Sequence, residues 1–323
     1  MTAPAAPVPL ILDTDIGDDV DDVFALLLAA RRPEVRLVGV TTVFGQVDER
    51  ARLARLMLEL AGREDVPVAA GSRETLGGRD PTGEGGATMA SARGMVGQAG
   101  SELWERLGRG LERRGAVDLI VETVRSSGEP VTLVAIGPLT NVAAALHRAP
   151  DLAGRVQEIV LMGGRLGEEA PKGEHNFNCD PEATRIVLES GARLKIGTYE
   201  VTRRAQLRRE HVAALRAGDA ASRAAGEQLN AYLDHCRRDW TSMYDPLSLT
   251  LAYTDRYLPT RGAALRVETS ERQVLLSEEP GAAPTADVSA ALDADGFVEH
   301  LLTTIAGAGD VRGASTRGAS ASP

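Results

Sequence analysis

Six aspartates between positions 13 and 22 are the residues of this chain with the clearest potential for chemistry. Like charges so close together repel one another unless a positive group lies among them. A hard divalent cation is the simplest such group, because it prefers oxygen ligands. The alternative is a solvated acidic loop that caps a helix, since carboxylates favour helix N-termini. Six carboxylates exceed what capping requires, so the cluster favours a metal or sugar site. Its members are Asp13, Asp15, Asp18, Asp19, Asp21 and Asp22.

The residues on either side of this cluster predict the elements that hold it. The apolar run at 9–12 is typical of a buried parallel strand. The spacing of Val20, Val23 and Phe24 predicts a helix directly afterwards. The carboxylates therefore lie between the carboxyl end of a strand and the start of a helix, which is where open α/β sheets bind ligands.

Alternating apolar segments along the rest of the chain predict an α/β fold. Short β-branched runs alternate with longer helical patterns, which implies right-handed βαβ units and a mostly parallel central sheet flanked by helices. Strands are expected at 10–12, 37–42, 66–69, 131–136, 159–161 and 194–196, with two more within 262–276. Helices are expected at 20–31, 48–61, 116–126, 139–148, 181–190, 207–216, 220–239 and 246–253.

Composition limits the classes of partner and compartment. The net charge of −10 over 323 residues argues against nucleic-acid binding through phosphate contacts. Cys179 and Cys236 lack metal-ligand spacing and fit a reducing compartment. The first residues match neither a signal peptide nor a membrane anchor. We therefore expect a cytoplasmic protein that binds neither nucleic acid nor membranes.

Two segments are expected to lie outside the packed core. Residues 71–100 are rich in Gly, Ser, Thr and Arg and have no clear period, which is typical of a lid or binding loop. Residues 307–323 are too polar and too small to bury a core, so we expect a disordered tail.

Several separated segments, in the expected order, resemble the inosine–uridine-preferring nucleoside hydrolases. Residues 13–26 resemble the family's opening DTDPGxDD motif and the apolar helix after it, and VGVTTVFG at 38–45 resembles its GITTVxGN, with Gln46 where asparagine is usual. The other matching segments are IGPLTN at 136–141, MGG at 162–164, EHNFNCDPEA at 174–183 and YDPL at 244–247. The resemblance covers about residues 8–306.

This resemblance implies a fold, an activity and an assembly. The fold would be one open, Rossmann-like α/β domain over residues 1–306. The activity would be hydrolysis of the N-glycosidic bond of ribonucleosides, giving free base and ribose. Family members usually form homodimers or homotetramers, so the resemblance implies a homo-oligomer that acts on a small-molecule nucleoside.

The opening motif allows two registers. Without a gap, Val20 stands where the family has its second paired aspartate. A two-residue insertion instead aligns Asp21 and Asp22 with the family pair, directly before the apolar helix. We adopt the gapped register. It leaves Asp18 and Asp19 as extra acids, for which helix-start capping or loop solvation is the expected role.

Carried over residue by residue, the resemblance implies a Ca²⁺ site. Its ligands would be the carboxylates of Asp15, Asp22 and Asp245 and the backbone carbonyl of Ile136. Because Ca²⁺ takes about six to eight oxygens, positions stay open for a water molecule and two ribose hydroxyls. Asp15 is also the implied general base.

Other matched residues are implied to hold the sugar. Asp21, Glu174 and Asn176 would bind ribose hydroxyls. Asp13 would orient the loop from behind, or serve as a buried structural aspartate.

The residues expected near the base depart from the family pattern. Members that cleave inosine and uridine alike usually have a histidine acid before the last metal aspartate, where this chain has Tyr244, and often a histidine where this chain has Arg93. Purine-preferring relatives stack the base on an aromatic at the first of these positions. We therefore expect Tyr244, with Trp240 or Tyr232, to bind a purine, and keep His235 as an alternative contact to the base.

Two further interpretations stay open from the sequence. A phosphatase of the haloacid dehalogenase type would use the D-x-D pattern of Asp13 and Asp15 with Mg²⁺. Gly17 stands where that family has Thr or Val, and the chain has only two lysines for its later catalytic lysine. The other interpretation is a non-catalytic Ca²⁺- and ribose-binding relative that lost turnover with its leaving-group acid.

Overall fold

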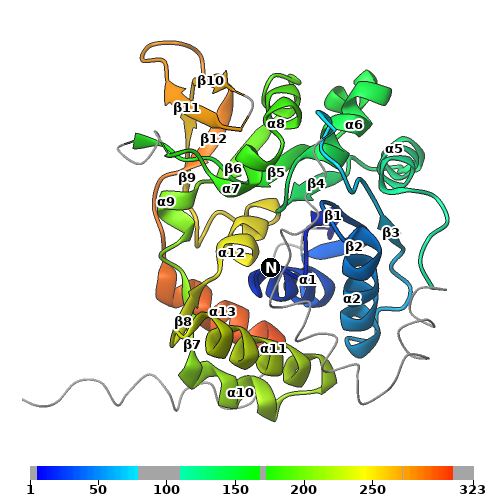
Figure 1. The fold of residues 1–323 in the computed structure, drawn as a ribbon, viewed down its shortest axis with the longest axis vertical. Helices are drawn as coiled ribbons and strands as arrows, with labels where there is room; N and C mark the ends of the chain where they lie inside the picture. Colours follow the sequence, from blue (N-terminus) through cyan, green and yellow to red (C-terminus); the bar gives the residue numbers. More distant parts are fainter. Residues whose placement is uncertain (1–5, 79–109, 168–171, 271, 308–323) are drawn as a thin grey trace, which may run out of the picture.

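A mostly parallel sheet forms the centre of the computed structural model, which describes residues 6–78, 110–167, 172–270 and 272–307. Its eight strands run in the order β3-β2-β1-β4-β5-β6-β12-β9, and β9 is antiparallel to its neighbour. The expected α/β fold with a mostly parallel sheet is confirmed (Figure 1). The strands are β1 (Val8–Thr14), β2 (Val35–Thr42), β3 (Val68–Ala70), β4 (Thr132–Ala135), β5 (Glu158–Met162), β6 (Leu194–Gly197), β9 (Thr260–Ala263) and β12 (Ala286–Ser289).

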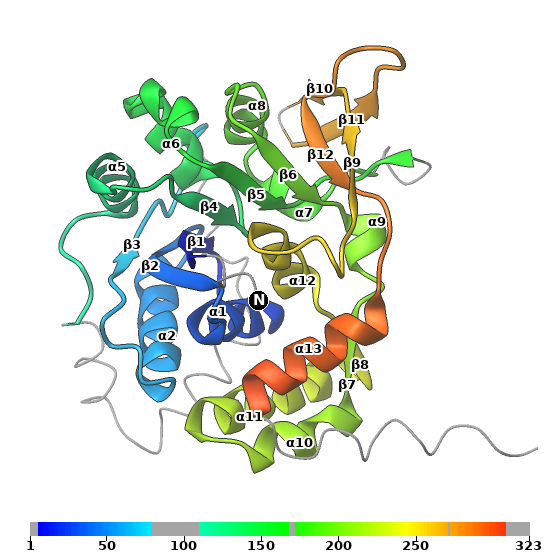
Figure 2. The same ribbon diagram turned by 180° about the vertical axis from the view of Figure 1, so that it is seen from behind.

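Helices cover both faces of this sheet, as the view from behind also shows (Figure 2). α5, α6 and α8 lie on one face, and α1, α2, α11, α12 and α13 lie on the other. β1 contributes side chains to the apolar cores on both faces of the sheet. Leu10 and Leu12 belong to one apolar cluster and Ile11 to the other, because successive side chains of a strand point to opposite faces. The helices are α1 (Asp21–Arg31), α2 (Val47–Leu60), α5 (Ala116–Ser126), α6 (Thr140–Arg148), α7 (His175–Cys179), α8 (Pro181–Leu188), α9 (Tyr199–Thr202), α10 (Val212–Ala217), α11 (Ala220–Cys236), α12 (Tyr244–Leu249) and α13 (Ala294–Ala306).

The strand order creates a place where ligands can bind. From β1 the chain moves outward through β2 and β3, then returns to the other side of β1 to form β4, β5 and β6. The connections at the carboxyl ends of β1 and β4 therefore diverge, which leaves a crevice between them. Asp13 on β1 pairs with Ala135 on β4, so Asp15 and Ile136 follow neighbouring strand ends.

The expected helix at 207–216 is wrong in its first half. β7 (Gln206–Arg208) pairs antiparallel with β8 (Trp240–Ser242), and α10 follows after a short 3₁₀ turn. Polar, apolar and polar residues alternate along β7, and Leu207 is fully buried. Pairing with a segment more than 30 residues away in sequence decided the structure here.

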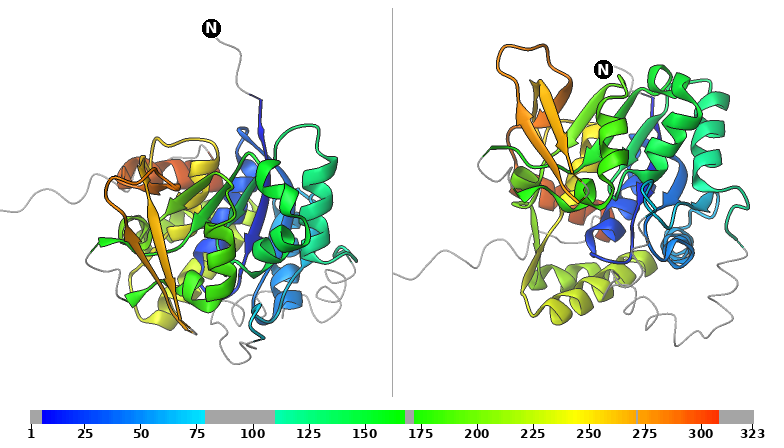
Figure 3. Two further views of the ribbon diagram at one scale, coloured as in Figure 1. Left: turned by 90° about the horizontal axis from the view of Figure 1, so that it is seen from above. Right: turned by 45° about the horizontal axis from the view of Figure 1, so that its top comes forward.

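The C-terminal part contains more elements than expected. Residues 262–276 were expected to hold two strands, whereas β9, β10 (Leu265–Thr269) and the start of β11 (Val274–Glu278) fall there. β10 and β11 pair as a separate hairpin that projects beyond the sheet (Figure 3). α13 was not expected, although the spacing of Phe297, Leu301 and Ile305 is helical.

Some expectations fall largely outside the described residues. These are the binding loop at 71–100, of which only 71–78 are described, Arg93, and the tail at 307–323, of which only Gly307 is described. The domain boundary at 306 stays a prediction. Within the described ranges, none of the helices has the length and apolar character needed to cross a membrane.

Candidate active site

A cavity of about 280 Å³ lies at the carboxyl ends of the central strands, where the strand order predicts it. Five aspartates of the opening cluster line it, so we call it the acidic cavity. Of the predicted site residues that the structure describes, Asp13, Tyr232, His235 and Trp240 do not line it. The predicted residues that it brings together are Asp15, Asp21, Asp22, Ile136, Glu174, Asn176, Tyr244 and Asp245.

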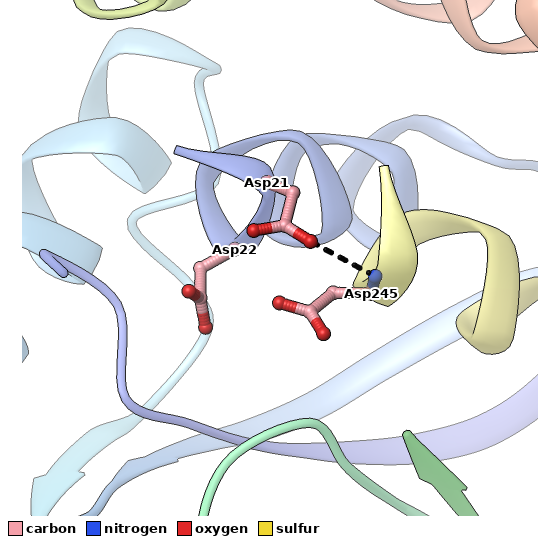
Figure 4. Close-up of side chains that lie close together, drawn as sticks. All are labelled: Asp21, Asp22 and Asp245. Atoms are coloured by element: carbon pink, nitrogen blue, oxygen red, sulfur yellow. Dashed lines mark hydrogen bonds between the residues drawn. The ribbon is translucent and has the colours of Figure 1, made fainter. Parts of the chain in front are cut away.

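Three buried carboxylates form the tightest acidic group among the described residues. Asp21 and Asp22 begin α1, and Asp245 lies in the first turn of α12 (Figure 4). Each offers an oxygen within 4.8 Å of those of the other two. The backbone N–H of Asp245 donates a hydrogen bond of 3.2 Å to Oδ2 of Asp21. The starts of two helices thus bring together acids from opposite ends of the chain.

Asp15 is held in the same cavity from two sides. The buried Arg50 guanidinium donates to the Asp15 backbone carbonyl and, over 2.7 Å, to that of Phe44. On the other side, a Cβ atom at Gly137 would lie 2.7 Å from Oδ1 of Asp15, so the close approach requires glycine there. Asp15 is 7% exposed and lines the cavity.

The protein places these carboxylates where negative charge is costly. Burial raises the pKa of Asp15 to about 6, although the nearby Arg50 charge works against this. Burial, and then repulsion between the acids, raise the pKa values of Asp21, Asp22 and Asp245 well above the ordinary range. A divalent cation with oxygen ligands fits this donor set, because it would offset the repulsion among three buried carboxylates.

Asp13 has a structural place behind the cavity. Its Oδ1 accepts hydrogen bonds from the Thr41 hydroxyl at 2.5 Å and the Asn141 amide at 2.7 Å. Burial raises its pKa to about 7. Asn141 also accepts a hydrogen bond from the Ser72 N–H at 2.9 Å. Asp13 and Asn141 together therefore join β1 to β2, to the start of α6 and to the segment after β3.

Glu174 and Asn176 occupy one wall of the acidic cavity. The Glu174 carboxylate caps α7 by accepting from the N–H groups of Asn176 and Phe177, and it also accepts from Gly164. The Asn176 amide in turn donates to the Ile136 carbonyl at 2.9 Å. Glu174 therefore positions Asn176 through the backbone.

Asp18 and Asp19, the two acids outside the aligned pair, each have a defined partner. Asp18 forms an ion pair of 2.7 Å with Arg50, and Asp19 accepts from the Val20 N–H at 2.6 Å. Both line the acidic cavity, so loop solvation does not describe them. The carboxylates of Asp21 and Asp22, rather than theirs, face Asp245, as the gapped register predicts.

An aromatic pair closes another side of the cavity. The rings of Tyr244 and Tyr199 stack with centroids 5.7 Å apart and planes 16° apart. Trp240 is 36% exposed and lines a neighbouring cavity, as does Tyr232. His235 lines neither cavity.

Sequence reasoning missed three residues that line the acidic cavity, Met162, Tyr199 and His175. Tyr199 follows the carboxyl end of β6, and strand-end position was a usable signal for it. His175 stands between two predicted residues, Glu174 and Asn176, and its Nε2 lies 3.5 Å from Sγ of Cys179.

Comparison with known proteins agrees with this geometry. The family model described as "Inosine-uridine preferring nucleoside hydrolase" matches residues 10–299. The pyrimidine-specific ribonucleoside hydrolase RihA of Enterobacter sp. (strain 638) is 34% identical over 315 residues, covering 93% of this chain and 98% of the relative. Uridine nucleosidase 1 of Arabidopsis thaliana is 33% identical, covering 80% and 78%.

Solved structures show the same fold. The purine-preferring ribonucleoside hydrolase from Gardnerella vaginalis superposes with a TM-score of 0.80 at 26% identity, covering 93% of this chain and 98% of that one. The phosphatase interpretation is set aside by these matches. The chain belongs to the inosine-uridine preferring nucleoside hydrolases and is an N-ribosyl hydrolase.

Proposed function

We propose that this chain is a Ca²⁺-dependent hydrolase that cleaves ribonucleosides into free base and ribose. The observation that carries the proposal is the convergence of the buried Asp21, Asp22 and Asp245 carboxylates beside Asp15, at the point where the strand order reverses. Buried acids without positive partners are costly, so a cation at this point explains why they converge.

The ion would be held by Asp15, Asp22, Asp245 and the Ile136 carbonyl. Two of these proposed ligands, Asp22 and Asp245, belong to the group of three close carboxylates. The third member of that group is Asp21, which precedes Asp22 in the first turn of α1. The Ile136 carbonyl accepts a hydrogen bond from the Asn176 amide. A carbonyl oxygen has two lone pairs, so the second one can bind the ion. When bound, such an ion lowers the pKa of a water molecule and helps to orient it.

The protein side chains supply the remaining steps. Asp15 accepts the proton of the attacking water, which is the task of a general base. Asp21 and Asn176 bind ribose hydroxyls and hold the ring while it develops oxocarbenium character. Glu174 keeps Asn176 in place through the hydrogen bonds that cap α7.

The aromatic pair is the proposed contact for the base. Burial raises the pKa of Tyr244 to about 12, so its phenol is a poor acid at neutral pH and a stacking surface is its better use. A two-ring base covers more of that surface, which favours a purine. The two curated relatives above are named for pyrimidines or uridine, so a pyrimidine preference is the competing outcome.

Two measurements test the proposal. Ribose release is followed over a panel of purine and pyrimidine ribonucleosides, before and after chelation. Ca²⁺ binding is measured independently by calorimetry on the chelated protein. We expect one ion per chain and activity that returns with Ca²⁺; turnover unaffected by chelation, with no calorimetric binding, would contradict the calcium site. We also propose a cytoplasmic homodimer or homotetramer, and sedimentation velocity measures the assembly.

A further inference from the structure

A second cavity of about 430 Å³ adjoins the acidic cavity. The two share Asp19, Tyr199 and Tyr244 in their walls. The other residues that line the second cavity come from the segment after α9, from the paired strands β7 and β8 with the loop before β8, and from α11, none of which supplies the carboxylate group of the first cavity. The stacked tyrosines therefore lie between two spaces of different chemistry.

Guanidinium groups give this second cavity its character, so we call it the arginine cavity. Arg203, Arg204 and Arg238 line it, against one carboxylate, that of Asp19. Among the described residues, neither Arg204 nor Arg238 forms an ion pair. Since the chain as a whole carries a net charge of −10, composition does not account for this local excess of positive charge.

Aromatic rings lie against the same positive charges. The Arg238 guanidinium lies 5.8 Å from the Trp240 ring centroid, and that of Arg203 lies 5.7 Å from the Tyr199 ring centroid. Outside the lining of this cavity, the Arg165 guanidinium lies 3.7 Å from the Tyr199 ring centroid. Rings and fixed positive charge together suit a flat, unsaturated group that carries negative charge.

We propose that the arginine cavity receives the base and selects ribonucleosides whose base carries a negative charge, such as a carboxylate. This inference rests on the proposed function and adds a substrate class to it. Tyr244 lines both cavities, so a base that stacks on it, with its sugar among the carboxylates, would extend into the cavity that Arg204 and Arg238 line. These two arginines are specificity-determining residues.

The arginine charges would also stabilise the leaving base, which gains electron density as the glycosidic bond breaks. The water oxygen forms a bond to C1′, the C1′–N bond breaks, and its electron pair leaves with the base nitrogen. The water proton passes to Asp15, and the released base takes its proton from solvent. Arginine cannot serve as the acid because its pKa is above about 12. Its fixed charge instead stabilises the electron density that accumulates on the base.

A matched pair of substrates tests the inference. 5-Carboxyuridine and 5-carbamoyluridine differ in one group, a charged oxygen in place of an amide nitrogen. The measured quantity is the ratio of their kcat/KM values. We expect a wild-type ratio above one that falls about tenfold in Arg204→Gln/Arg238→Gln, because charge-assisted hydrogen bonds to the carboxylate are lost. Comparing ratios cancels the intrinsic lability of each substrate.

The control removes two exposed arginine charges far from both cavities. Arg125 and Arg155 are similarly exposed and both pair with Asp151, before the amino end of β5. Arg125→Gln/Arg155→Gln should keep the wild-type ratio. The wild-type ratio should also fall as salt is raised from about 0.05 M to about 0.5 M, since screening weakens exposed charges.

The possible outcomes distinguish a failure of this inference from a failure of the proposed function on which it rests. Equal ratios in the wild type and the Arg204→Gln/Arg238→Gln variant, with uridine or inosine still cleaved, would overturn the arginine selectivity and leave the hydrolase intact. Release of ribose from none of the nucleosides, by the wild-type protein loaded with Ca²⁺, would overturn the proposed function and this inference together.

Discussion

The backbone N–H of Asp245 donates a hydrogen bond to the side chain of Asp21, and the two residues are 224 positions apart in the chain. The bond joins the start of α12 to the start of α1, and the two helices also pack against each other (Figure 4). It keeps the Asp245 carboxylate beside those of Asp21 and Asp22. The proposed sugar and metal site is thus a property of the α1–α12 contact.

Replacing Asp15 by asparagine should remove nearly all activity and leave the fold intact. The side chain keeps its size and one oxygen but loses the ability to accept a proton. General-base assistance is worth about 10²- to 10⁴-fold, and weaker Ca²⁺ binding would add to the loss. Single-turnover ribose release and circular dichroism measure the two effects. A variant that kept more than about a tenth of the wild-type kcat would contradict Asp15 as the base.

Asp22→Asn and Asp18→Asn should differ in Ca²⁺ binding. Asp22 belongs to the carboxylate group at the helix starts, whereas Asp18 is paired with Arg50. Ca²⁺ should raise the Tm of the wild-type protein, because a ligand of the native state stabilises it. We expect Asp22→Asn to reduce this shift far more than Asp18→Asn does. The reverse order would contradict the gapped register.

Tyr244→Ala should lower kcat for purine nucleosides more than it raises KM. Stacking on the departing base acts on the transition state, because the base gains electron density as the bond breaks. Steady-state kinetics with inosine and uridine measure the effect. Efficient uridine cleavage with a nearly silent Tyr244→Ala change would show that another residue handles the leaving group, and would agree with the names of the curated relatives.

His300 should make stability depend on pH in the acid range. The Nε2 atom of this half-buried ring lies 2.9 Å from the Tyr253 hydroxyl. Burial, and then the Arg32 and Arg256 charges, lower its pKa from 6.5 to about 4, with Glu34 opposing. Between these values the unfolded chain binds the proton and the native protein does not, so unfolding becomes easier as pH falls.

The size of this effect follows from the partial burial. The contribution of neutral His300 should be complete above about pH 6.5 and decline toward pH 4, by about 1–2 kcal/mol after solvent screening. Urea unfolding of the wild type and of His300→Gln across this range measures it. The variant should show a shallower pH dependence than the wild type; parallel curves would rule out His300 as the source.

Much of the fold was already determined by the sequence, because its signals are local. Strand and helix periods placed the first six strands and most helices within a few residues. The acidic cluster was placed correctly at the end of β1, since the apolar runs on both sides of it define where the strand stops and the helix starts. Gly137 falls between a strand and a helix expected from the sequence, although its need for a missing Cβ beside Asp15 appears only in three dimensions.

What the tertiary structure decided depends on contacts between distant segments. β7 became a strand because β8 pairs with it, against the helical period of its own sequence. Trp240 and Tyr244 are close in sequence, yet Trp240 lines only the arginine cavity, whereas Tyr244 lines both cavities. Arg204 and Arg238 come from different loops and give no sequence signal of acting together. Periodicity reports which face of an element is buried, but which side chains meet across a cavity depends on how the elements pack.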